Sequence, residues 1–201
     1  MFKKTMLAVS VAVMAMGSVS VMAEDTVPTG TDVGLITFDG AVTDTTCKIT
    51  TNNGVDANNV TITLPVVKKA DLEKATIDAG IGSKEFELYL TNCPATLTSA
   101  SATFTSQQFA DLSNGTLKAD PTVAGYAKNV ALAMYNNAPS KTDRIKVGQP
   151  ANNTQAATLT SGTGTLSYRV AYVPGANWVK GTNDLTAGKV SSNVTFTMSY
   201  Q

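Results

Sequence analysis

Few side chains in this chain of 201 residues could carry out chemistry. The sequence contains no histidine, so it lacks the commonest general base and the commonest metal ligand. The candidate carboxylate pairs, Asp71 with Glu73 and Glu85 with Glu87, have spacings typical of solvated strand or loop faces. These residues predict neither a catalytic site nor a metal site, and we expect no enzyme activity and no bound cofactor.

The charge balance also excludes a class of partners. Lysine and arginine together number 15, as do aspartate and glutamate, so the chain has no basic field that would attract nucleic acid. With 43% hydrophobic and 15% charged residues, the composition is that of a globular protein and not of a disordered one.

The two cysteines, Cys47 and Cys93, are most simply read as one disulfide in an oxidising compartment. They are too far apart in the sequence for a CxxC redox motif, and one pair without histidine cannot complete a structural zinc site. Closing a loop of this length would stabilise the fold by roughly 4 kcal/mol in the chain-entropy description. We therefore expect a structural disulfide.

The first segment predicts export. Lys3 and Lys4 precede an apolar run over residues 6–16, and small residues end at Ala23, which is the pattern of a secretory signal peptide at residues 1–23. The alternative, a membrane anchor, is disfavoured because the run is interrupted and falls short of the about 20 apolar residues that span a bilayer. We expect an exported chain without a membrane anchor.

The elements that must position any functional side chain are predicted to be strands. Apolar side chains recur at every second position, as in half-buried strands, and clusters of Gly, Asn, Pro and Ser separate the runs. This pattern predicts a single all-β sandwich or barrel, with residues 68–79 as a loop that contains about one helical turn. The alternating runs are Ile36–Phe38, Val60–Leu64, Phe86–Leu90, Val130–Met134, Leu166–Tyr172 and Val194–Tyr200.

The two ends of the exported chain carry the most information. The last run places its apolar residues at alternate positions almost to the final residue, so in an immunoglobulin-like strand order we expect the chain to stop one strand short and leave an open groove. The first run, residues 34–42, has two glycines on its apolar face. Such glycines mark either a bulge or a close approach of another backbone, and the pattern alone leaves both interpretations open.

Several features together resemble type 1-like fimbrial pilins of the bacterial chaperone/usher pathway. They are residues 36–42 shortly before Cys47, residues 61–65, residues 90–93, Gly188 at the fourteenth position from the end, and the penultimate Tyr200. The combination is far more specific than a signal peptide or a cysteine pair alone.

The resemblance implies an incomplete immunoglobulin-like sandwich that lacks its last strand. Residues 24–42 would form an N-terminal extension and residues 43–201 the pilin domain, with Cys47 and Cys93 joining the first strand to the third. Donor-strand residues and acceptor residues are also implied. The donor residues would be Gly34, Ile36, Phe38, Gly40 and Val42, and the acceptor or chaperone-binding residues would be Gly188, Val194, Phe196, Met198 and Tyr200.

The implied function is that of a structural subunit of a surface fimbria that supports adhesion. Its partners would be a periplasmic pilus chaperone, an outer-membrane usher and neighbouring pilin subunits in a homopolymer, and it would pass through the periplasm to the cell-surface fimbrium. We expect the repeating shaft subunit, with a minor adaptor pilin as the alternative. A secreted carbohydrate-binding module is a further alternative, because Tyr172, Asn177 and Trp178 cluster near a Pro-Gly turn where a sugar could stack.

Overall fold

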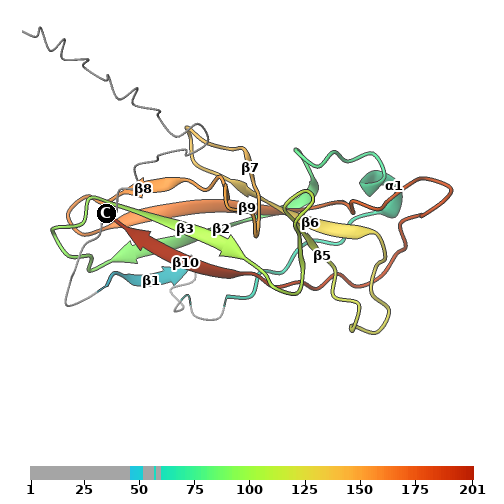
Figure 1. Ribbon diagram of the computed structural model, residues 1–201, viewed down its shortest axis with the longest axis horizontal. Helices are drawn as coiled ribbons and strands as arrows, with labels where there is room; N and C mark the ends of the chain where they lie inside the picture. The colour runs from blue at the N-terminus through green and yellow to red at the C-terminus, as the bar shows by residue number, and fades with distance from the viewer. Residues whose placement is uncertain (1–45, 52–56, 58–59) are drawn as a thin grey trace, which may run out of the picture. The chain divides into compact units, whose positions relative to one another are not determined.

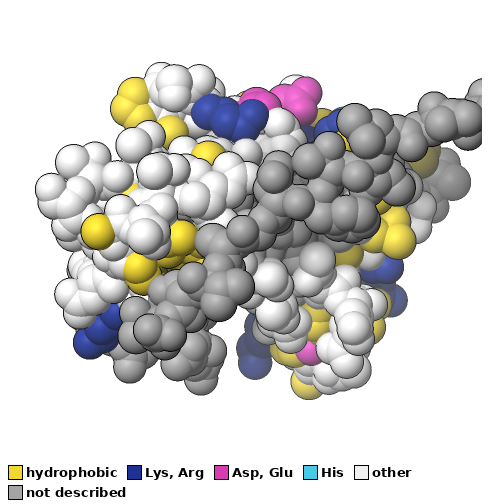
Figure 2. All heavy atoms as spheres, turned by 60° about the vertical axis from the view of Figure 1, so that its left-hand side comes forward, with side chains coloured by type: hydrophobic (Ala, Val, Ile, Leu, Met, Phe, Trp, Pro, Cys, Tyr) yellow, Lys and Arg dark blue, Asp and Glu magenta, His cyan; other side chains and the backbone are white. Residues whose placement is uncertain are grey.

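The computed structural model describes residues 46–51, 57 and 60–201, which form two antiparallel β-sheets (Figure 1). The predicted signal peptide and the predicted donor strand lie outside the described residues. Within the described part of the chain, no helix is long and apolar enough to cross a membrane. Charged side chains are scattered over the face shown in Figure 2, in agreement with the balanced charge of the sequence.

The larger sheet has seven strands in the order β1-β2-β9-β6-β5-β4, with β7 paired to β6. The smaller sheet has the order β10-β3-β8. The strands of the larger sheet are β1 (Lys48–Thr51), β2 (Ile81–Thr91), β4 (Ala110–Asp111), β5 (Thr116–Lys118), β6 (Val130–Asn136), β7 (Arg144–Ile145) and β9 (Gly164–Pro174). Those of the smaller sheet are β3 (Ser99–Thr105), β8 (Ala156–Thr158) and β10 (Thr195–Tyr200).

The main core lies between the two sheets, because each strand turns one of its faces inward. Leu88 of β2 and Leu166 of β9 are fully buried there, and so is Phe104 of β3 from the smaller sheet. The ring of Tyr168 joins the two layers, with its centroid 5.0 Å from that of Phe104 in an edge-to-face arrangement. The prediction of an all-β, immunoglobulin-like sandwich is confirmed.

Strand β6 is buried on both of its faces. Its outward-facing Tyr135 is covered by the loop that follows the single described helix, α1 (Lys69–Leu72), and donates a hydrogen bond of 2.7 Å to the carbonyl of Ile77. The guanidinium of Arg169 lies 3.9 Å from the centre of the same ring. Burial of the phenol raises the pKa of Tyr135 to about 12. The prediction of a loop with one helical turn at residues 68–79 is confirmed.

The prediction of a strand at residues 60–64 is wrong. The segment is extended, and its apolar side chains do alternate toward the core, but it forms no strand ladder with any described residue. Alternation reports which side chains are buried and does not report whether the backbone has a pairing partner.

Candidate functional site

The candidate site begins at the free edge of β10. Gln201 and Ser99 exchange two backbone hydrogen bonds of 3.0 Å, so they form a hydrogen-bonded pair of the β10–β3 ladder. In an antiparallel ladder such pairs alternate with non-hydrogen-bonded pairs. The N–H and C=O groups of Phe196, Met198 and Tyr200 therefore point away from β3, toward a side on which no described strand pairs with β10.

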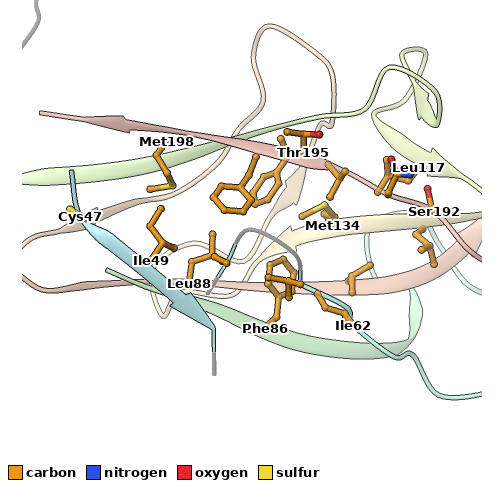
Figure 3. A pocket seen from close by; sticks show the side chains of 18 of the residues that line it. Cys47, Ile49, Ile62, Phe86, Leu88, Leu117, Met134, Ser192, Thr195 and Met198 are labelled. Atoms are coloured by element: carbon orange, nitrogen blue, oxygen red, sulfur yellow. The ribbon is translucent and has the colours of Figure 1, made fainter. Parts of the chain in front are cut away.

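The same alternate residues turn their side chains into an apolar groove of about 980 Å³. The backbone groups that could pair with another strand and the side chains that line the groove thus belong to the same residues of β10. From this side the groove is lined by the apolar residues Val194, Phe196, Met198 and Tyr200, and by the polar residues Ser192, Asn193 and Thr195. Figure 3 shows Met198 near Cys47 toward one end, and Ser192 near Leu117 toward the other.

The opposite wall comes from Ile49 of β1 and from the extended segment at residues 60–64, which contributes Val60, Ile62 and Leu64. This explains the alternation that predicted a strand there: the side chains face the groove, although the backbone forms no ladder with a described residue. An extended segment placed between this wall and β10 would have apolar side chains below it and backbone partners along β10.

The floor of the groove is the sandwich core itself. Leu88, Phe104 and Met134 reach it from three different strands and from both sheets. The ring centroids of Phe104 and Phe196 are 6.4 Å apart, so the aromatic cluster continues from the core into the wall. A side chain entering the groove would therefore contact residues that also hold the two sheets together.

The groove offers hydrophobic contact and few charges. Lys48 is the only charged side chain among the described residues that line it. The Ser192 hydroxyl is buried and has no hydrogen-bond partner among the described residues, and burial raises the pKa of Tyr200. Recognition here would depend on apolar side chains and backbone hydrogen bonds, not on ion pairs.

Cys47 and Cys93 form a disulfide, as predicted, and the described residues contain no free cysteine. The expected connection from the first strand to the third is wrong, however. The bridge joins the residue before β1 to the turn after β2, and these two strands are antiparallel neighbours with Lys48 opposite Thr91. Residues 60–64, which lie between these two strands in the sequence, form no strand ladder with any described residue.

The structure does not bring all the predicted acceptor residues together. Gly188 is not among the residues that line the groove; it packs against the loop at residues 125–127, where an added Cβ would lie 2.4 Å from the carbonyl oxygen of Gly125. Lys189 next to it donates a 2.9 Å hydrogen bond to the same carbonyl. Gly188 therefore fixes the chain that leads into β10. The predicted donor residues, Gly34, Ile36, Phe38, Gly40 and Val42, lie outside the described residues.

Strand β3, which pairs with β10 and supplies Phe104 to the floor of the groove, was not predicted from the sequence. Its sequence alternates alanine with serine and threonine, so the period-two signal is present, but only Phe104 is a large apolar residue. The signal for this strand is the alternation of alanine with hydroxyl residues, which is weak because alanine is small.

A sandwich with an apolar groove along the free edge of a strand is suited to binding an extended chain segment by strand addition. Residues 36–201 match the family described as "Fimbrial protein". The chain is 33% identical to the "Major fimbrial subunit SMF-1" of Stenotrophomonas maltophilia, over 83% of this chain and 92% of the relative. It is 29% identical to the "F17 fimbrial protein" of Escherichia coli, over 84% of this chain and 87% of the relative. It is also 29% identical to the "Laminin-binding fimbrial subunit ElfA" of Escherichia coli O157:H7, over 98% of this chain and 99% of that one.

The chain belongs to the fimbrial protein family and is a fimbrial subunit. The relatives are structural subunits and not enzymes, in agreement with the prediction from the missing histidine.

Proposed function

We propose that this chain is the repeating shaft subunit of a surface fimbria and polymerises head to tail by donor-strand exchange. In this proposal, residues 34–42 of one subunit enter the groove of the next and pair with the free edge of β10. The observation that carries it is the groove itself, in which every second residue of one strand presents both open backbone groups and an apolar side chain.

The donor sequence has the chemistry that this groove requires. Ile36 and Phe38 are spaced by two, as residues that face one side of a strand must be, and Gly40 continues the same face. Each buried isoleucine or phenylalanine contributes about 1.5–3 kcal/mol, and each backbone hydrogen bond about 0.5–1.5 kcal/mol. The sum reaches about 10 kcal/mol before ordering costs are subtracted, which favours very slow dissociation.

The proposed contact joins two different surfaces of identical subunits. A heterologous contact produces a filament where its rotation does not close a ring, and the filament is the assembly that we propose. The shaft role is supported by the relative named as a major fimbrial subunit. Before polymerisation, the free edge and the apolar groove would be an aggregation hazard, so we also propose that a periplasmic chaperone covers them and that an outer-membrane usher assembles the filament at the cell surface.

The test introduces leucine at two adjacent positions of the proposed donor segment. Gly40→Leu places a large side chain on the face that enters the groove, whereas Ala41→Leu places it on the opposite face. We expect Gly40→Leu to block filament growth and Ala41→Leu to allow it, while both variants still co-purify with the chaperone. Equal growth of the two variants would contradict the donor assignment.

A second arm removes residues 24–40. The truncated subunit should keep its own groove and remain bound to the chaperone, but it should fail to fill the groove of a neighbour. Continued filament growth by the truncated subunit alone would show that the donor lies elsewhere in the chain.

A further inference from the structure

A second hollow, of about 300 Å³, lies on the outer side of the larger sheet. It is bordered by β4, by the end of β5, by the start of β6 and by the turn at residues 174–177. Neighbouring residues separate it from the groove: Leu117 and Leu132 line the groove, while Lys118 and Ala131, the next pair in the same ladder, line the hollow. The two sites therefore occupy opposite faces of β5 and β6.

The hollow exists because small residues stand where larger ones would fill the space. Ala119, Ala127 and Ala131 are buried in its lining, and Gly175 and Ala176 form part of its rim. The result is an apolar base with room for a compact ligand but not for an extended chain segment.

The rim carries polar groups held in fixed positions. The Oδ1 atom of Asp111 accepts hydrogen bonds from the backbone N–H and the hydroxyl of Ser113, at 3.1 and 2.6 Å, which leaves its second oxygen available. The side-chain amide N–H of Asn129 donates to the carbonyls of Asn183 and Asp184, at 3.1 and 3.0 Å, and its own carbonyl oxygen accepts no hydrogen bond from a described residue. These groups are already oriented before any ligand arrives.

Three further polar side chains on the rim make no hydrogen bond within the described part of the chain: the amides of Gln108 and Asn177 and the hydroxyl of Tyr126. The ring of Tyr126 is half-buried beside the apolar base, together with the buried ring of Phe109. The lining contains one carboxylate, that of Asp111, and one ammonium group, that of Lys118, and so carries no net charge.

We propose that this hollow binds one neutral pyranose ring of a glycan. A pyranose has an apolar C–H face and a rim of hydroxyl groups, which match an apolar base with an aromatic ring and a rim of amides and one carboxylate. A charged sugar is disfavoured by the balanced lining, and a peptide is disfavoured by the small volume. The proposal does not depend on what fills the groove, because the two sites face opposite sides of the sheet.

The sequence suggested a sugar-stacking surface at the nearby Pro-Gly turn, with Tyr172 and Trp178 as its aromatic residues. Trp178 and Tyr172 pack against a cluster that includes Leu72 and Leu185. Neither aromatic residue lines the hollow, whereas Asn177 does. In this proposal the turn contributes Asn177, and Tyr126 supplies the ring available for stacking.

The experiment uses the full exported chain and four probes: the methyl pyranosides of glucose, galactose, mannose and N-acetylglucosamine. Saturation-transfer and protein-observed NMR titrations should detect binding of at least one probe. Loss of one hydrogen bond in Asp111→Asn or Asn177→Ala should weaken that binding by about two- to twelvefold. Ala176→Phe, at an exposed rim position, should abolish binding by filling the hollow.

Two matched controls separate this site from the rest of the surface. Lys180→Ala alters an exposed residue outside the hollow, and Phe196→Ala alters the groove; both should leave pyranoside binding unchanged. Absence of binding by all four probes up to about 50 mM would overturn the proposal. Binding that survives Ala176→Phe would overturn it as well, since the sugar would then sit elsewhere.

Discussion

Phe196 offers the most direct test of how the groove works. The residue lies opposite Phe104 in the β10–β3 register, lines the groove and is only partly buried in the described structure. We expect Phe196→Ala to act in two places: it removes contacts with the aromatic cluster of the subunit's own core, and it removes the surface on which an incoming strand would pack.

The expected size of the effect follows from burial. Completely burying a phenylalanine side chain contributes about 1.5–3 kcal/mol, and part of that burial already exists in the empty groove. The part of the burial energy that is gained only when a donor strand binds limits the loss of affinity to about a hundredfold. The part that already exists in the empty groove should appear as lower thermal stability of the subunit itself.

The assay measures binding of a fluorescent peptide with the sequence of residues 24–42 to the exported subunit, together with its unfolding temperature. Thr197→Ala is the matched control, because Thr197 is the next residue of the same strand and is exposed on the opposite face. If Thr197→Ala weakened peptide binding as much as Phe196→Ala, or if Phe196→Ala bound the peptide like the unaltered subunit, the groove would not be the strand-binding surface.

Three other perturbations test the scaffold around the groove. Replacing Cys47 and Cys93 with serine should remove roughly 4 kcal/mol of a typical 5–15 kcal/mol and lower the amount of exported subunit, as measured by unfolding and by periplasmic yield; an unchanged unfolding temperature would contradict this. Gly188→Ala should destabilise the domain by about 1–3 kcal/mol or more, because the added Cβ would lie 2.4 Å from a backbone oxygen, and denaturant unfolding measures this directly. The hydrogen bond from Asn153 holds the pKa of Asp143 below its ordinary value near 3.8, so the small stabilising effect of the ionised carboxylate is present above about pH 4 and is lost as the pH falls. Asp143→Asn should therefore flatten the acid side of the profile of unfolding free energy against pH. An unchanged profile would contradict a stabilising role for this carboxylate.

The strands with large alternating side chains could be predicted from the sequence, because large apolar residues at every second position mark the buried face of a strand. The runs around Leu88, Leu132 and Tyr168 fall within β2, β6 and β9, and the final run corresponds to β10. These strands surround the core, where alternation and burial coincide. The β3 strand was not predicted, since its inward positions at Ala100 and Ala102 are small and its outward positions are hydroxyl residues.

The groove could be anticipated only from one side. The final run indicated a strand with an apolar face, but the opposite wall at residues 60–64 was assigned to a strand of its own. The two walls are brought together by pairings remote in sequence, β1 with β2 and β10 with β3, which a local pattern does not encode. The hollow bordered by Asp111, Tyr126 and Asn177 has no sequence signature for the same reason: its residues come from four separate segments.

The groove and the hollow lie on opposite faces of β5 and β6, so we expect ligands to bind independently at the two sites. Filling the groove acts on Leu117 and Leu132, and a ligand in the hollow acts on Lys118 and Ala131, so the two sites share strands but not side chains. Substitutions at sites without shared partners usually add in free energy to within about 0.5 kcal/mol. The double variant Phe196→Ala with Ala176→Phe should therefore lose donor-peptide affinity and pyranoside binding each to the same extent as the matching single variant. A coupling larger than that limit would mean that the sheet transmits groove occupancy to its outer face.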